Sequence, residues 1–269
     1  MTRGKKQLIP RAAVAGTDLG RREAMTVLGA AGVVLLLGCG EDTLAAGSAA
    51  SGADGGTGGT DGGTTACVLD PNLTKGPYWI DERLNRSDIR SDSHNLASPN
   101  PRPGLPLTLQ FAVYAYDAGT CTPLSGAQVD IWHCDGSGLY SDVASTVGQD
   151  FLRGYQVTDV NGIVGFTTIY PGWYSGRAVH IHVKVRIFDA SSNVTTEATT
   201  QVFFDDSVTD AVFAANAPYN LRGARDIRNA SDNIYAGQSQ LLLALRGSAT
   251  GGYTGTASLG VRVGTVSAG

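Results

Sequence analysis

The stretch from Ile169 to Val185, read as IYPGWYSGRAVHIHVKV, constrains this chain more than any other. Successive side chains of a β-strand point to opposite faces, and the second half of this stretch alternates aliphatic with polar residues. His180 and His182 therefore share one face, close enough to bind one metal ion, and that face continues into Lys184 and Arg186. The opposite, aliphatic face consists of Val179, Ile181, Val183 and Val185.

Several other segments show strand periodicity or turn chemistry. Asn161-Gly162, within Thr158 to Gly162, predicts a hairpin between residues 155–157 and the strand 163–169. Only Asp206 to Ala215 looks helical. We therefore expect an all-β fold, an antiparallel β-sandwich with long loops and little helix. The remaining expected strands are 107–117, 127–133 (after a turn at 123–126), 196–204, 240–246 and a short run at 259–263.

Composition limits the class of protein. The chain has 269 residues, a hydrophobic fraction of 42% and a net charge of -4, enough for one well-filled domain with appendages. The scattered charges form no basic stripe, so no nucleic-acid partner is expected. With 36 glycines and four cysteines, the chain resembles a loop-rich β protein rather than a disulfide-rich miniprotein.

The first 66 residues carry targeting signals and a linker. An apolar run, Val27 to Gly38, follows Arg21-Arg22 and ends at Cys39. Residues 1–39 therefore resemble an export signal with a twin-arginine pair and a lipobox-like end, which predicts an exported lipoprotein acylated on Cys39. The alternative is a cleaved signal peptide in which Cys39 is incidental. Residues 40–66 are small and polar and predict a flexible linker, with the folded domain at 67–269.

Four short segments, in order, resemble the intradiol ring-cleavage dioxygenases, the family of catechol 1,2-dioxygenase and protocatechuate 3,4-dioxygenase. They are Gly76-Pro77-Tyr78, the segment WHCDGSGLY from Trp132 to Tyr140, the turn YPGWY ending at Tyr174, and RAVHIH from Arg177 to His182. The similarity runs from about Gly76 to about Arg228 and is strongest to exported, single-domain relatives. Four segments in the right order are far more specific than any one of them.

The resemblance implies non-haem Fe(III) held by Tyr140, Tyr174, His180 and His182. Phenols ionise readily beside a trivalent cation, and two imidazoles complete the ligand set without adding charge. The implied reaction cleaves a catechol-type ring with O2 between its two hydroxylated carbons and gives a muconate-type diacid. Three further residues match family positions with implied roles: Arg177 as the arginine that stabilises negative charge on the ring, Gln201 as a pocket glutamine, and Tyr78 at the substrate mouth.

Other interpretations stay open from the residues alone. Tyr140 and Tyr174 taken singly are typical half-buried tyrosines, and Arg177 could form a surface salt bridge. A surface-tethered sandwich module that binds a ligand or polymer without catalysis is the competing class of protein. A Zn or Cu hydrolase is disfavoured, because no carboxylate or third histidine has a suitable spacing. We expect His133 to be structural and assign no role to His94.

The chain also departs from the better-known relatives. Tyr174 lies only six positions before His180, which implies a more open pocket, and a helical dimerisation module is missing, so the oligomeric state cannot be transferred. Cys67 and Cys121 are the candidate disulfide of an exported domain. A Cys121–Cys134 bridge is less favoured, because the intervening strand would separate them by roughly 20 Å. Cys134 is expected to be a small buried thiol.

The lipobox-like end makes a direct prediction about the mature protein. Mass spectrometry of the membrane-extracted protein should find a diacylglyceryl group on Cys39 as the new N-terminal residue, and Cys39→Ala should abolish it. A free thiol at Cys39, or an N-terminus further along the chain, would contradict the lipid anchor.

Overall fold

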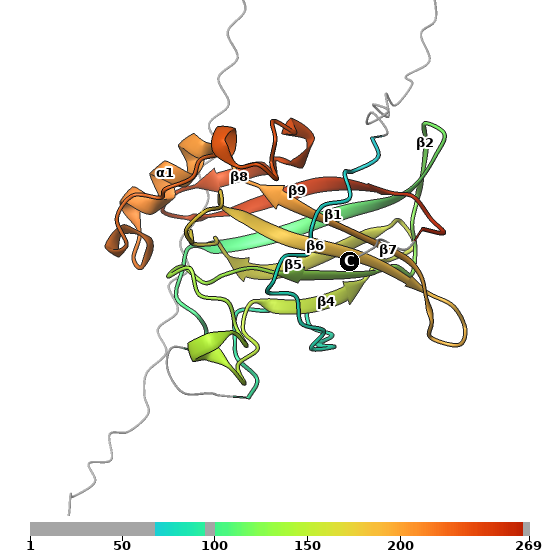
Figure 1. Ribbon diagram of the computed structural model, residues 1–269, viewed down its shortest axis with the longest axis horizontal. Coiled ribbons are helices and arrows are strands. Elements are labelled where there is room, and N and C mark those ends of the chain that lie inside the picture. Colours follow the sequence, from blue (N-terminus) through green and yellow to red (C-terminus); the bar gives the residue numbers. More distant parts are fainter. Residues whose placement is uncertain (1–67, 95–99, 266–269) are drawn as a thin grey trace, which may run out of the picture. The chain divides into compact units, whose positions relative to one another are not determined.

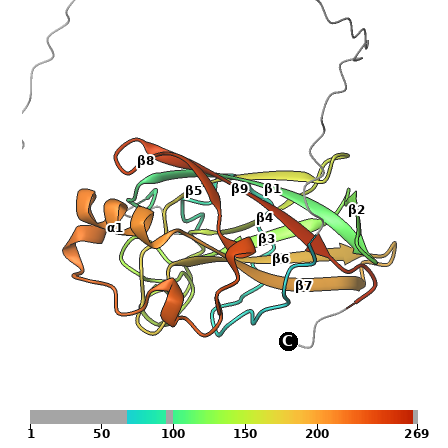
Figure 2. The same ribbon diagram turned by 90° about the horizontal axis from the view of Figure 1, so that it is seen from above.

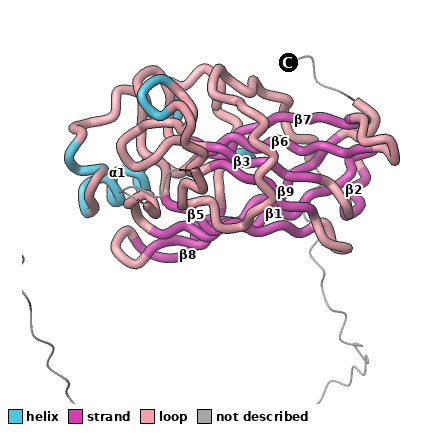
Figure 3. The backbone as a smooth tube through the Cα atoms, turned by 90° about the horizontal axis from the view of Figure 1, so that it is seen from below, coloured by secondary structure: helices cyan, strands magenta, loops and turns pink. Residues whose placement is uncertain are grey.

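The structure is a computed structural model that describes residues 68–94 and 100–265. The predictions for the leader, the linker, Cys39 and Cys67 lie outside the described residues. Within them, two β-sheets pack face to face and most of the helical structure lies at one end of the sandwich, as Figures 1 to 3 show. The predicted all-β sandwich with little helix is confirmed. No helix among the described residues has the length and hydrophobicity needed to span a membrane.

The first sheet is built around one long central strand. β1 pairs antiparallel with β2 and β5 and, on its other side, parallel with β9, so the sandwich contains one parallel pair. β8 closes the sheet beside β9. The five strands are β1 (Pro106–Asp117), β2 (Thr120–Pro123), β5 (Ile163–Ile169), β8 (Ala244–Ser248) and β9 (Gly252–Val261).

The second sheet carries the two histidines in its interior. Its order is β4-β3-β6-β7, and every pair is antiparallel. His182 on β6 lies opposite Trp132 on β3 and opposite Gln201 on β7. Three sequence segments therefore meet at one level of the sheet. The strands are β3 (Gln128–Trp132), β4 (Arg153–Val157), β6 (His180–Phe188) and β7 (Val194–Phe203).

Helical structure among the described residues is limited to one helix and four short 3-10 turns. α1 (Asp206–Ala215) agrees with the predicted range, and Asp205 caps it by accepting a hydrogen bond from the Ser207 backbone N–H at 2.7 Å. The 3-10 turns are Ala144–Thr146, Tyr219–Leu221, Asn229–Ser231 and Ser239–Leu241.

The hairpin predicted at residues 158–162 is wrong. β4 pairs with β3, whereas β5 pairs with β1 in the other sheet, so the segment crosses between the two sheets. The turn residues do reverse the chain, and Gly162 has the positive φ that such a turn requires, at 75°. Turn chemistry fixes the reversal of the chain but not the partners of the two strands.

Two strand boundaries near the C-terminus also differ from expectation. The range 240–246 is divided between a 3-10 turn and β8, and the short run at 259–263 is the end of the longer β9. The missed half of β9 includes Gly252 and Gly255, which hide it from a search for alternating hydrophobic residues. This segment forms a strand because it pairs with β1 on one side and β8 on the other, although its own sequence does not predict a strand.

Both faces of β6 are buried, and they differ in chemistry. Ile181, Val183 and Val185 lie in the hydrophobic core between the sheets, as the alternation predicts. On the other face Lys184 is 2% exposed, and its ammonium forms an ion pair with Glu197 at 2.6 Å and lies over the ring of Trp79. The segment before β1 covers this face, and Figure 1 shows it in cyan across β6. The histidine face is therefore a second, polar interior.

The structure gives the bonding state of two of the cysteines. Cys121 is disulfide-bonded, and Cys134 is a free, buried thiol. The Cys121–Cys134 alternative is therefore excluded and the buried thiol is confirmed. The pairing of Cys121 with Cys67 stays a prediction, because Cys67 lies outside the described residues.

The packing of β6 predicts a large stability difference between two truncations. Ile181 is fully buried, so Ile181→Ala should lower the free energy of unfolding by about 2 to 5 kcal/mol, because it leaves a cavity in the core. Val160 is 82% exposed, so Val160→Ala should change it by less than about 0.5 kcal/mol. Denaturant unfolding measures both, and equal effects would contradict the described core.

Candidate metal centre

Tyr140 lies in the long loop that follows β3. Asp135 holds this loop, since its carboxylate accepts hydrogen bonds from the backbone N–H groups of Ser137 and Leu139 at 2.8 and 3.0 Å. Arg153, which is 3% exposed, donates to the Ser141 hydroxyl and to the Ser141 carbonyl, both at 2.7 Å. The phenol of Tyr140 is thus carried by a loop that is fixed on both sides of it.

Tyr174 lies in the connection that leaves β5 in one sheet and enters β6 in the other. This connection is tied to the Tyr140 loop at Gly172, whose N–H donates to the Asp135 carbonyl at 3.1 Å. A Cβ atom at Gly172 would lie 2.5 Å from that same oxygen, so only glycine allows the two loops to approach. The two tyrosine-bearing loops are therefore neighbours, although the residues come from different parts of the chain.

The side chains of the four predicted ligands meet at the start of β6. The Tyr174 hydroxyl lies 3.3 Å from Nε2 of His180, which lies 3.1 Å from Nε2 of His182. The ring of Tyr140 is 5.6 Å from that of Tyr174 and 6.2 Å from that of His182, measured between centroids. The structure thus brings together all four residues that the sequence singled out.

The hydrogen bonds of the two imidazoles fit a cation between them. Nδ1 of His180 lies 2.7 Å from the carbonyl of Ala178, which can only accept, so Nδ1 carries the proton and Nε2 presents a lone pair. This lone pair faces Nε2 of His182. The Tyr140 hydroxyl is also buried, and although the Tyr174 side chain interacts with it, it makes no hydrogen bond of ordinary geometry to the described residues. A histidine that donates its other N–H to a backbone carbonyl is the usual arrangement of a metal ligand.

Burial sets the charge state of these groups in the protein alone. Desolvation lowers the pKa of His180 to about 3 and that of His182 well below its ordinary value. It also raises the pKa of Tyr174 to about 12 and that of Tyr140 well above 10. Both imidazoles are therefore neutral, the form that binds metal ions, whereas the phenols need a nearby cation to ionise.

Arg177 and Gln201 lie beside this group and bond to each other. Nη2 of Arg177 donates to Oε1 of Gln201 at 2.6 Å, and Nε donates to the carboxylate of Asp232 at 2.8 Å. Gln201 is fully buried and donates from Nε2 to the Thr74 carbonyl at 3.0 Å. The surface salt bridge considered for Arg177 is thus an ion pair with a carboxylate whose side chain is fully buried.

Aromatic rings form the walls of the site. Trp132 stacks on His182 with centroids 4.7 Å apart, and Tyr78 stacks on Tyr140 at 4.4 Å. Gly76 lies against the His182 ring, where an added Cβ would be 3.3 Å from Cε1. The Gly76-Pro77-Tyr78 segment therefore belongs to the wall of the site, where the half-buried Tyr78 contacts the rings of Tyr140 and Tyr174. Its role at a substrate mouth stays a prediction.

The other two described histidines lie outside the group. His133 is buried and bonds to the Cys134 carbonyl and the Thr168 hydroxyl at 2.8 and 2.7 Å, as expected for a structural histidine. His94 lies near Asp92 and Asp150 in an acidic cluster, with Nδ1 at 3.0 Å from the Asp150 carboxylate. Arg86 and Ser93 also bond to Asp150, and the His94 side chain is 64% exposed, so protein partners account for this cluster.

The sequence did not predict the contacts that three residues of the site make. Asp232 is more than fifty residues from Arg177, Thr74 contributes only a backbone carbonyl, and Gly76 acts by lacking a side chain. Only Gly76 stood in a motif, and there it indicated the family rather than contact with His182.

Comparisons with known proteins point to one class of enzyme. Residues 74–244 match a family described as "Dioxygenase". A solved intradiol ring-cleavage dioxygenase from Tetranychus urticae is 31% identical, with a TM-score of 0.63, and the match covers 75% of this chain and 98% of that one. The dioxygenase domain of a dioxygenase carbohydrate-binding protein fusion from Streptomyces sp. SirexAA-E is 28% identical, with a TM-score of 0.51, covering 73% and 99%.

Curated relatives match over shorter stretches. A chlorocatechol 1,2-dioxygenase from Pseudomonas putida is 32% identical over 81 residues, covering 23% of this chain and 31% of the relative. A catechol 1,2-dioxygenase from Candida albicans is 28% identical over 148 residues, covering 44% and 49%. The chain thus spans between about a third and a half of the length of these curated relatives.

The matched region includes every residue of the four-donor group, together with Arg177, Gln201 and Asp232. The chain belongs to the intradiol ring-cleavage dioxygenase family. Members of this family use non-haem iron.

The approach of Gly76 to His182 predicts a specific loss of metal affinity. Gly76→Ala places a methyl group against the imidazole, at a φ of +69° that side chains rarely adopt, so it should lower iron affinity by roughly ten-fold or more. Gly126→Ala is the matched control, with a φ of +76° and nothing within 4 Å of an added Cβ. Chelator competition measures affinity and thermal unfolding measures strain. Equal iron affinities in the two variants would contradict the contact.

Proposed function

We propose that this protein is a non-haem Fe(III) intradiol dioxygenase that cleaves catechol-type rings between the two hydroxylated carbons, using O2 to give muconate-type diacids. The observation that carries the proposal is the meeting of two phenols and two neutral imidazoles from separate segments at one point. Anionic oxygen donors favour a hard, trivalent cation, and the imidazoles add no charge. Tyr140, Tyr174, His180 and His182 would hold the iron.

Bound Fe(III) supplies Lewis acidity, which favours the catechol dianion and prepares its ring for reaction with O2. The protein contributes the remaining steps through its own side chains. Tyr174 is the more accessible of the two phenols, since Tyr140 is 5% exposed and Tyr174 is half-buried. Burial raises the pKa of Tyr174 to about 12, so its phenolate oxygen would readily accept and hold a proton from a bound catechol.

Arg177 supplies positive charge where the ring becomes negative. Its guanidinium is held at two nitrogens by Asp232 and Gln201, so it needs little reorganisation during the reaction. The third nitrogen, Nη1, makes no hydrogen bond to the described residues and is the donor left for a substrate. Gln201 acts as the orienting partner, because its other end is fixed to the Thr74 carbonyl.

The same proposal places the enzyme outside the cytoplasm, tethered by the lipid on Cys39 through the 40–66 linker. The leader features of the sequence support this location, and so does the disulfide at Cys121, because such bonds persist in oxidising compartments. Catechol-type aromatics and O2 are its proposed partners, with no nucleic acid and no membrane contact beyond the anchor.

Oxygen uptake by the purified iron-loaded protein tests the proposal. We expect uptake with at least one member of a panel of catechol, protocatechuate, hydroxyquinol and larger catechols, and a red-brown colour from tyrosinate-to-iron charge transfer. Tyr174→Phe and His182→Ala should each abolish uptake while the domain stays folded by circular dichroism, because each removes a proposed iron ligand.

His94→Ala is the matched control for the loss of an imidazole, because His94 lies outside the group and its side chain is 64% exposed. This variant should keep wild-type uptake and colour. A colourless wild-type protein that takes up no oxygen with any catechol would instead support the non-catalytic binding module.

A further inference from the structure

Asp232 makes an unusual set of contacts beside the proposed iron site. Its side chain is fully buried, and its two carboxylate oxygens accept hydrogen bonds from four N–H donors among the described residues. One oxygen accepts from Nε of Arg177 at 2.8 Å and from the backbone N–H of Ala178 at 2.7 Å. The other accepts from the N–H groups of Ile234 and Tyr235 at 2.8 and 3.0 Å. A single carboxylate thus joins a C-terminal segment to the residues just before β6.

The contact with Ala178 leads directly to a proposed iron ligand. The N–H of Ala178 donates to Asp232, while the carbonyl of Ala178 accepts the Nδ1 proton of His180 at 2.7 Å. That second bond leaves the lone pair of His180 on Nε2, toward the other donors. Asp232 therefore fixes the backbone that fixes the ring of His180.

The contact with Arg177 leads to the proposed charge-stabilising group. The guanidinium is held between Asp232 and Gln201, whose acceptor oxygens lie 2.8 and 2.6 Å from Nε and Nη2. Without the carboxylate, Gln201 would be the one remaining acceptor of the two, and the guanidinium would be free to rotate. The same oxygen of Asp232 thus serves both an iron ligand and a substrate-facing cation.

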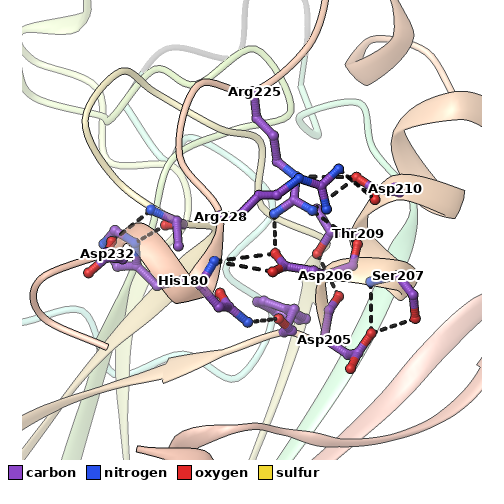
Figure 4. A network of polar contacts seen from close by, with 12 residues as sticks. His180, Asp205, Asp206, Ser207, Thr209, Asp210, Arg225, Arg228 and Asp232 are labelled. Carbon is purple, nitrogen blue, oxygen red and sulfur yellow. Dashed lines mark hydrogen bonds and ion pairs between the residues drawn. The ribbon is translucent and has the colours of Figure 1, made fainter. Parts of the chain in front are cut away.

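The segment just before Asp232 is held against the N-terminal half of α1. Asp206 accepts from Arg225 and from the N–H of Asn229, and Asp210 accepts from Arg225 and Arg228 at 2.9 Å. These contacts fix residues 225–229, just before Asp232, against the helix. Figure 4 shows Asp232 and His180 beside this network. The segment that leads into Asp232 is thus tied to a helix at several points.

We propose that Asp232 is a positioning residue, which fixes the Arg177 guanidinium for the reaction and the His180 imidazole for iron. This inference rests on the proposed function. A carboxylate is required because the paired donors approach both of its oxygens. Asparagine has one acceptor oxygen, and its amide group would face one pair of donors. Loss of a group that orients a metal ligand typically costs roughly 10- to 100-fold in metal affinity or activity.

The test compares Asp232→Asn with Asp130→Asn in the iron-loaded protein. Asp130 is 5% exposed and, like Asp232, forms an ion pair with an arginine, here Arg186 at 2.8 Å. Both residues of this pair lie in the sheet that carries His180 and His182, but Asp130 contacts none of the proposed site residues. We expect Asp232→Asn to lower kcat by roughly ten-fold or more with a smaller change in KM, and to speed iron loss to a chelator by a similar factor. Asp130→Asn should leave both unchanged, whatever its melting temperature.

A double-mutant cycle separates the two roles. In an Arg177→Gln background, Asp232→Asn should lower kcat no further, because its effect on the reaction passes through Arg177. It should still speed iron loss, because that effect passes through Ala178 and His180. If Asp232→Asn does not fold, Asp232→Glu takes its place, since the longer side chain keeps the charge but displaces both oxygens. For Asp232→Glu we likewise expect a lower kcat and faster iron loss.

Wild-type kcat and iron loss in a folded Asp232 variant would overturn the proposal. A further fall of kcat in the Arg177→Gln background would overturn the role through Arg177. The wild-type protein is assayed first: if it binds no iron and takes up no oxygen, the proposed function fails. An active wild type with an unaffected variant contradicts only the role of Asp232.

Discussion

The two facing Nε2 atoms of His180 and His182 are the interaction on which this site depends. At 3.1 Å, with the His180 proton committed to the Ala178 carbonyl, a lone pair meets a second ring nitrogen inside a water-excluded space. Nδ1 of His182 is also buried without a hydrogen-bond partner among the described residues. With the His182 proton on Nδ1, the two Nε2 lone pairs face each other at 3.1 Å, an arrangement that costs free energy unless a cation lies between them. The arrangement fits a cation-binding site and would be unfavourable in a packed core.

The second polar interior of the sandwich makes this possible. A β-sandwich normally buries one face of each sheet and leaves the other to solvent. Here the segment before β1 covers the outer face of β6, so that His180, His182 and Lys184 are each at most 2% exposed. Trp79 provides much of the cover, through its contacts with Trp132 and Lys184. The low dielectric of this region shifts the pKa of both histidines downward and of both tyrosines upward.

Hydrophobic periodicity is enough to predict the buried face and the approximate range of a single helix or strand. The alternation in β1 and β6 and the range of α1 agree with the structure, because burial on one face imposes a local pattern. Pairing between distant strands leaves no such pattern, which explains the wrong hairpin at 158–162 and the undetected start of β9. For the site, motif resemblance identified the residues that meet, including Arg177 and Gln201. It could not identify Asp232, whose contribution depends on how a distant segment folds back onto β6.

The path of the chain between β5 and β6 has a consequence for assembly. This connection carries Tyr174 out of one sheet and delivers His180 to the other, while Tyr140 arrives from a loop of the second sheet. Three donors therefore belong to the second sheet and its loop, and the fourth, on Tyr174, joins them only when the connection from β5 is in place. Binding of the ion by all four would thus require that the two layers have docked, and a bound ion would then oppose their separation.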